Sequence, residues 1–171
     1  TRFLTHTSRT PLAWQRHFAQ WLKKQKIRSH EIDQVIICSV VPKVLKLIHT
    51  ALKEFFHQTH SPFSILSSGG GPASGRHFPK LSVVGRDIKV PIVNRYRYPK
   101  QVGQDRLVNA YSGYVQYGSS RGEATGAPLI IVDFGTATTF DVVSKKGEYL
   151  GGVIFPGVYI SLEALFKNTA K

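Results

Sequence analysis

An aspartate at the end of an apolar strand is the feature that most constrains how this chain folds. Residues 128–132 read Pro-Leu-Ile-Ile-Val, and Asp133 follows them directly. This run and the apolar run 138–143 predict two strands, and the short polar segment between them predicts a tight turn. A carboxylate beside a buried strand is costly unless it has a partner. The sequence therefore predicts either a bound group or a self-capped turn at this point.

The residues of the turn favour a polyphosphate as the bound group. Gly135 allows the backbone to approach a ligand closely, while Thr136 and Thr138 add hydroxyls to the N–H donors of the turn. The carboxylate of Asp133 is suited to a cation that screens the phosphates, held directly or through water. The alternative is a plain hairpin in which Asp133 caps its own turn. A bare Asp-x-Gly-Thr would favour that alternative, but the longer string with strands on both sides favours phosphate binding.

A second cluster, Gly103-Gln104-Asp105-Arg106, stands at the start of a predicted helix. A carboxylate can accept the proton of a hydroxyl nucleophile in phosphoryl transfer, where positioning and charge neutralisation dominate. Arg106 is suited to binding a substrate carboxylate through two hydrogen bonds. The alternative is that Asp105 only complements the helix dipole, and alone this explanation would be as good as catalysis.

The third cluster runs from Gly151 to Gly157 and reads Gly-Gly-Val-Ile-Phe-Pro-Gly. Its glycine pair predicts a close approach of the backbone to another group, and Gly157 precedes a helix N-terminus that could face an anion. A tight strand-to-helix turn is the simpler explanation, and without the neighbouring clusters it would be preferred.

The remaining pattern alternates helices with strands, which favours an α/β or α+β class. We expect helices from Thr10–Pro11 to about Leu22, from Pro42 to about Phe56, from about 102 to 117, and from near Gly157. Expected strands are 34–41, 63–66, 90–95, 128–132, 138–143 and 149–154, with a glycine-rich loop over 67–75. A polar link over 119–127 predicts a domain boundary, which divides the chain into 1–126 and 127–171.

Composition says more about the partners and the cellular compartment of the protein than about its chemistry. The formal charge is +13 over 171 residues, without a block of five or six like charges, so basic residues are expected on solvated faces and nucleic-acid binding is disfavoured. The single cysteine, Cys38, excludes a disulfide within the chain and fits a reducing cytoplasm. Its place in the apolar run 35–38 predicts a buried thiol. The apolar runs are far shorter than the roughly 20 residues that a membrane helix needs.

Together, these three clusters resemble the type III pantothenate kinase family in their order, spacing and flanking strands. Weaker similarities are Ser39-Val40-Val41-Pro42, Tyr96-Arg97-Tyr98-Pro99 and Asn168-Thr169-Ala170-Lys171, so that the resemblance covers nearly the whole chain. It is strong from Tyr96 onward and loose before it. Members of this family have also carried the label Bvg accessory factor, which suggests a transcriptional activator.

The resemblance implies an actin-like, ribonuclease H-like kinase of two similar domains. It implies that ATP phosphorylates pantothenate at the start of coenzyme A synthesis, with Mg²⁺, a monovalent cation (K⁺ or NH₄⁺) and a cytoplasmic homodimer. Asp105 corresponds to the catalytic base, and Asp133 to the cation ligand. The residues that correspond to pantothenate contacts are Tyr96, Gly103, Gln104 and Arg106, and those that correspond to ATP contacts are Gly135, Thr136 and Thr138.

Departures from the family pattern bear on activity. Gln104 stands where a small apolar residue is common. The family's first phosphate motif, Asp-x-Gly-Asn-Thr, and the second half of its C-terminal domain do not occur in the sequence, which also lacks Met and begins at Thr1. We therefore expect a fragment truncated at both ends that is inactive alone.

Two other functions remain open at this point. The same fold could phosphorylate a different small hydroxylated substrate, although Tyr96 and Gly103–Arg106 favour pantothenate. A DNA-binding activator would need a helix-turn-helix or another reading element, and the sequence contains no recognisable one.

Overall fold

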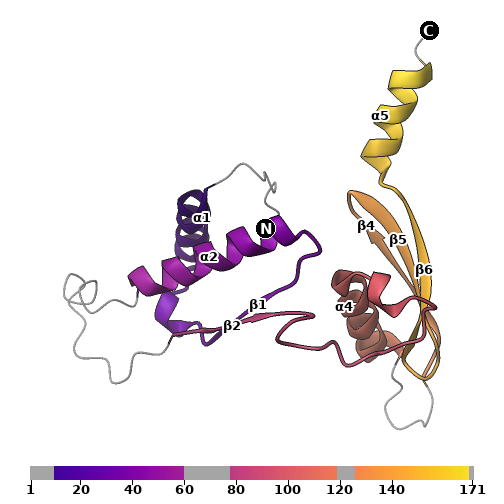
Figure 1. The fold of residues 1–171 in the computed structure, drawn as a ribbon, viewed down its shortest axis with the longest axis horizontal. Helices are drawn as coiled ribbons and strands as arrows, with labels where there is room; N and C mark the ends of the chain where they lie inside the picture. The colour runs from indigo at the N-terminus through magenta and orange to yellow at the C-terminus, as the bar shows by residue number, and fades with distance from the viewer. Residues whose placement is uncertain (1–9, 60–77, 119–125, 170–171) are drawn as a thin grey trace. The chain divides into compact units, whose positions relative to one another are not determined.

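A computed structural model describes residues 10–59, 78–118 and 126–169, which form two compact units, Thr1–Lys89 and Val90–Lys171 (Figure 1). The expected strand 63–66, the loop 67–75 and most of the link 119–127 lie outside the described residues. The compact units divide between Lys89 and Val90. The predicted boundary at 126/127 concerns the two domains of a kinase fold, and it stays a prediction.

The first unit begins with the helix that local signals predicted. Helix α1 spans Pro11–Gln25, and the Thr10 hydroxyl accepts a hydrogen bond from the backbone N–H of Ala13 at 3.3 Å. Proline suits the first helical position because the missing N–H is not needed there. The helix ends at Lys26, whose left-handed backbone (φ 57°) lets its N–H reach the carbonyl of Leu22. The predicted start of this helix is confirmed.

Helix α2, Pro42–Thr59, connects two parallel strands, β1 (Gln34–Ile37) and β2 (Lys80–Val83), with a short 3₁₀ turn, Ser29–Glu31, before β1. Apolar side chains from both helices and both strands form the core of this unit. The buried members of the core are Leu22, Ile37, Leu52, Phe55, Phe56 and Val83.

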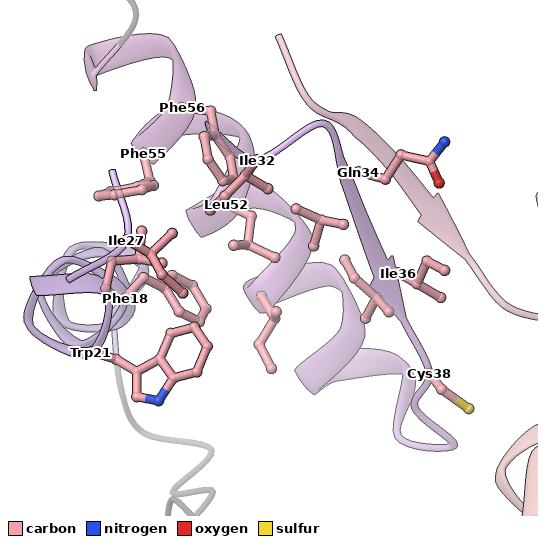
Figure 2. A pocket seen from close by; sticks show the side chains of 14 residues that line it. Phe18, Trp21, Ile27, Ile32, Gln34, Ile36, Cys38, Leu52, Phe55 and Phe56 are labelled. Carbon is pink, nitrogen blue, oxygen red and sulfur yellow. The ribbon is translucent and has the colours of Figure 1, made fainter. Parts of the chain in front are cut away.

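Strand β1 is shorter than the predicted 34–41 and is buried on one face only. Figure 2 shows Gln34, Ile36 and Cys38 pointing away from the helices, as the two-residue period of a strand requires. Ile36 is 62% exposed, and Cys38 is exposed as well. The prediction of a buried thiol is wrong because an apolar run does not reveal which face of the strand meets the core.

The second unit contains a four-stranded sheet in the order β3-β6-β5-β4. Its strands are β3 (Val93–Asn94), β4 (Leu129–Phe134), β5 (Ala137–Val143) and β6 (Glu148–Pro156). Strand β5 pairs antiparallel with β4 and with β6, while β3 runs parallel to β6. The three strands predicted between 128 and 154 are confirmed, and the strand predicted over 90–95 is reduced to two residues.

Helix α4, Gln104–Gly113, lies against β4 and β5. A 3₁₀ turn, Pro99–Gln101, precedes it, and a π-helical turn, Tyr114–Gly118, continues it to about the predicted end. The core of this unit consists of Val102, Leu107, Ala110, Val143 and Tyr149.

Helix α5, Val158–Thr169, projects from the end of β6 in Figure 1 and has no buried residue. The two units together confirm the mixed α/β class. Among the described residues, no helix combines the length and apolarity that crossing a membrane requires.

Because of Asp87, the stability of the first unit is expected to depend on pH. Its carboxylate accepts hydrogen bonds from the Arg86 side chain and from the backbone N–H of Val83 at 2.8 Å, which together close the turn after β2. These bonds lower the pKa of Asp87 from its ordinary value to about 2. Since the folded pKa is depressed, the contribution is present above about pH 4, the unfolded value, and is lost as the pH falls towards 2.

We therefore expect Asp87→Asn to lower the urea midpoint of the first unit at neutral pH and to flatten its decline below about pH 4. Tryptophan fluorescence is the measurement, because both tryptophans, Trp14 and Trp21, lie in α1. Asp105→Asn in the second unit is the control and should leave the tryptophan-detected curve unchanged. If the urea midpoints of Asp87→Asn and wild type declined in parallel throughout the acid range, Asp87 would not be the source of the acid dependence.

Candidate active site

Helix α4 carries the cluster 103–106 to the sheet of the second unit. Gly103 is its N-cap, and the Gly103 carbonyl accepts the backbone N–H of Leu107 at 3.3 Å. Leu107 and Ala110 are buried in the core and fix the rotation of the helix. With that face buried, Asp105 lies exposed in the first turn, whereas the Arg106 side chain reaches β5. Gln104 is half-buried at the first helical position.

The predicted tight turn between β4 and β5 is present, and it is shorter than the segment 133–137 that the predicted strands left between them. Only Gly135 and Thr136 separate the strands, and the Gly135 N–H donates to the carbonyl of Ala137 at 3.0 Å. Gly157 supports this turn from the β6–α5 junction by donating its N–H to the Thr136 carbonyl at 3.0 Å. A Cβ at Gly157 would lie 2.4 Å from the carbonyl oxygens of Gly135 and Thr136, so only glycine fits. Thr136 is exposed and Thr138 is buried.

Asn109 connects α4 to the acid at the end of β4. Its side-chain amide donates to Asp133 Oδ2 at 3.2 Å. Asp105 precedes Asn109 by four residues and therefore lies one turn away on the same side of the helix. The predicted base and the predicted cation ligand thus belong to one surface of the second unit. Asn109 was not among the predicted site residues, although its spacing from Asp105 could have indicated it.

A buried carboxylate, Asp141 of β5, organises the other side of the site. Asp141 Oδ1 accepts hydrogen bonds from Arg106 Nε at 2.8 Å and from the Tyr149 hydroxyl at 2.7 Å, and Arg106 Nη2 lies 2.6 Å from the same oxygen. Asp141 is fully buried, and the Arg106 side chain is 14% exposed. We call these three residues the Arg106–Asp141–Tyr149 network.

Ionisation in this network follows from burial and from the charge of Asp141. Burial raises the pKa of Tyr149, and the hydrogen bond to Asp141 raises that pKa further, so the hydroxyl remains a neutral donor. Burial alone would lower the pKa of Arg106, but the hydrogen bond to Asp141 and its negative charge outweigh burial and raise the pKa. Asp141 and Tyr149 were not among the predicted site residues, because their pairing depends on the register of β5 with β6.

The glycine pair in β6 leaves room for side chains of the protein itself. Gly151 has a φ of 121° at a β-bulge, and a Cβ there would lie 2.9 Å from the Tyr96 ring. At Gly152 a Cβ would lie 1.9 Å from the Phe140 carbonyl oxygen and 2.6 Å from Arg106 Nη2. The close approach predicted from the sequence therefore occurs in mid-strand. It accommodates Tyr96 and Arg106, two of the residues whose positions resemble pantothenate contacts.

The second unit contains all the predicted site residues, on α4, on the β4–β5 turn and beside β6. Their roles in binding and catalysis stay predictions. In the described parts of the chain, no group of three or more histidine, cysteine, aspartate or glutamate side chains could hold a metal ion. Asp133 offers one exposed carboxylate with oxygen chemistry suited to K⁺ or Mg²⁺. That donor set fits a cation shared with substrate oxygens better than one enclosed by protein.

The first unit contains an apolar pocket between α1, α2 and β1 (Figure 2). Apart from Gln34 and Cys38, its lining is apolar, with Phe18, Trp21 and Phe55 among the larger side chains. It offers no set of converging polar groups, and none of the predicted site residues lines it.

A family model described as Type III pantothenate kinase matches residues 73–171, which include every predicted site residue. The chain belongs to the type III pantothenate kinase family. Curated relatives with that name agree over most of the chain. The relative from Persephonella marina is 41% identical over 145 residues, and the relative from Finegoldia magna is 38% identical over 152 residues.

These alignments cover 85% and 89% of the chain but 46% and 47% of the two relatives. A third relative, from Pelobacter propionicus, is 42% identical over 140 residues, which are 82% of the chain and 44% of that protein. The chain thus spans about half the length of the type III pantothenate kinases that it matches.

The geometry of β6 predicts that Gly152→Ala is destabilising. The new methyl group would displace the Phe140 backbone and the Arg106 guanidinium, an overpacking that costs about 1–3 kcal/mol. Gly135→Ala is the matched control, because its Cβ would meet nothing nearer than 3.5 Å, and a change within about 0.5 kcal/mol is expected. Urea unfolding followed by tyrosine fluorescence measures both, since all seven tyrosines lie in the second unit. Equal effects of the two substitutions would contradict the close approach at Gly152.

Proposed function

We propose that a full-length protein carrying this sequence transfers the γ-phosphoryl group of ATP to pantothenate. The product is 4'-phosphopantothenate, and the reaction begins coenzyme A synthesis. The observation that carries the proposal is the family match over residues 73–171, the segment in which α4, the β4–β5 turn and β6 hold the site residues. We propose further, from the resemblance alone, an actin-like two-domain fold, a homodimer and a cytoplasmic location.

Asp105 is the base in this proposal. As the pantothenate hydroxyl oxygen bonds to the γ-phosphorus, the bond from that phosphorus to the β–γ bridging oxygen breaks and ADP leaves. The hydroxyl proton passes to Asp105, which is exposed in the first turn of α4. Asp105 Oδ1 accepts the backbone N–H of Arg106 at 2.9 Å, and among the described residues nothing hydrogen-bonds to Oδ2. Oδ2 is therefore available for the proton.

Pantothenate is an acid, and Arg106 is the cationic side chain nearest to the base in sequence. Its guanidinium lies against Gly152 of β6, and the Tyr96 ring lies against the neighbouring Gly151. We propose that Arg106 and Tyr96 hold the substrate, while Gly103 and Gln104 at the start of α4 contact it through the backbone and the amide. The arrangement would orient the hydroxyl of pantothenate towards Asp105.

The β4–β5 turn is the proposed phosphate site. Gly135, Thr136 and Thr138 would contact ATP through N–H groups and hydroxyls, and the support from Gly157 keeps the turn in place. Asp133, oriented by Asn109, would hold the monovalent cation, and Mg²⁺ would accompany the phosphates. Such cations, when bound, neutralise charge that develops on the transferring phosphoryl group.

Removing the proposed base should stop turnover without preventing folding. In a full-length protein, Asp105→Asn is expected to lower pantothenate-dependent ADP release by about 10²–10⁴-fold, the usual contribution of a general base. Glu31→Gln, an exposed carboxylate of the first unit, is the control and should retain activity. The 171-residue chain alone is expected to be inactive. A fully active Asp105→Asn protein would show that Asp105 is not the base. Turnover by the 171-residue chain alone would contradict its expected inactivity.

The cation role of Asp133 predicts a change in cation dependence. Asp133→Asn removes the negative charge but keeps an oxygen, so about tenfold more K⁺ should be needed for half-maximal rate, the equivalent of about 1.4 kcal/mol. Titration of the rate with KCl at constant ionic strength is the measurement. Asp87→Asn, distant in sequence and in the other unit, is the control. An unchanged KCl titration with Asp133→Asn would remove Asp133 from the cation site.

A further inference from the structure

The hydrogen bonds of the Arg106–Asp141–Tyr149 network are unevenly distributed over its atoms. Both Arg106 Nε and the Tyr149 hydroxyl donate to Oδ1 of Asp141, whereas Oδ2 has only the Thr139 hydroxyl at 3.5 Å. Arg106 Nη2 is the third group on Oδ1 and also reaches the Phe140 carbonyl at 3.5 Å. One oxygen of Asp141 thus fixes the Nε edge of the guanidinium.

The opposite edge of the guanidinium is left for another group. Within the described residues, Arg106 Nη1 makes no hydrogen bond, and it is not among the buried polar atoms that lack a partner. A planar guanidinium with one edge held can present its remaining donors in only one direction. Asp141 already binds Arg106 Nε and Nη2. A substrate carboxylate therefore cannot pair side-on with these two nitrogens.

Packing fixes the same orientation from the other side. The absence of a side chain at Gly152 allows Arg106 Nη2 to lie against β6, and the absence of one at Gly151 allows the Tyr96 ring to lie against the neighbouring residue of the same strand. Tyr96 also packs against the core cluster that includes Tyr149. Tyr96 and Arg106, two of the proposed pantothenate contacts, therefore both depend on the glycine pair, and Asp141 and Tyr149 complete the support of Arg106.

Stability alone is a weak reason for this network. A buried ion pair is often no more stabilising than apolar residues of similar volume, because both charges lose their hydration. In the network, a fully buried aspartate that also binds a tyrosine hydroxyl holds one edge of the arginine. This contact sets the direction of the remaining arginine donors. Setting the direction of a donor is what recognition of a carboxylate requires.

We propose that Asp141 and Tyr149 are positioning residues that orient Arg106 Nη1 towards the carboxylate of the acid substrate without touching that substrate. The inference rests on the proposed function, since it takes pantothenate as the acid. It predicts that weakening the network raises KM for pantothenate while KM for ATP and kcat change little.

Tyr149→Phe is the primary test, because it keeps the ion pair and nearly the same volume. In a full-length protein, KM for pantothenate should rise about three- to tenfold, the range for losing one typical intramolecular hydrogen bond. Tyr114→Phe is the matched control, since the Tyr114 hydroxyl donates to the Lys145 carbonyl at 3.0 Å elsewhere in the unit. It should leave KM for pantothenate unchanged. Asp141→Asn should have a larger effect than Tyr149→Phe, and tyrosine fluorescence shows whether that variant folds.

A double substitution separates positioning from general damage. Lysine has no counterpart of Nε, so in an Arg106→Lys background Tyr149→Phe should raise KM for pantothenate no further.

The outcomes distinguish this inference from the proposed function. If the wild-type protein releases ADP without regard to pantothenate, the proposed function fails. If wild-type turnover requires pantothenate but Tyr149→Phe leaves its KM unchanged, or raises KM for ATP equally, the positioning role of the network is overturned.

Discussion

A carboxylate without access to solvent places a strict demand on its surroundings, and in this chain the demand comes from Asp141. Its charge has to be met by donors, and the donors arrive from three places: the arginine of α4, the tyrosine of β6 and a threonine of its own strand. Helix α4 therefore cannot rotate or slide along the sheet without leaving a buried charge unpaired, which typically costs about 3–5 kcal/mol. The position of Asp105, next to Arg106 in the sequence, follows from this constraint.

The second contact between α4 and the sheet strengthens the same arrangement. Asn109 reaches Asp133 at the end of β4, while Leu107 and Ala110 are buried between the two polar contacts. The helix thus meets β4 and β5 through one polar contact each, on either side of an apolar centre. Glycine at 151, 152 and 157 then permits the close approaches by which Tyr96, Arg106 and the β4–β5 turn fit around β6 and its junction with α5.

Local signals in the sequence were sufficient where the cause is local. The threonine cap and proline of α1, the proline start of α2 and the presence of a tight turn between β4 and β5 were predictable because each depends on neighbouring residues. Side-chain pairing across elements was not predictable in this way. Asp141 and Tyr149 entered the site only through the register of β5 with β6, and the pairing of Asn109 with Asp133 only through the rotation of α4. The one-sided burial of β1, which left Cys38 exposed, similarly depends on which strand face meets the helices.

The central claim is that the site assembled in the second unit serves phosphoryl transfer to pantothenate. The most direct measurement is phosphorus NMR of a full-length protein carrying this sequence, incubated with ATP, Mg²⁺, K⁺ and pantothenate. If the site serves this transfer, a phosphomonoester of pantothenate should appear in step with ADP, and neither should form when pantothenate is omitted. Release of ADP with inorganic phosphate alone, or complete retention of ATP by a folded protein, would contradict it.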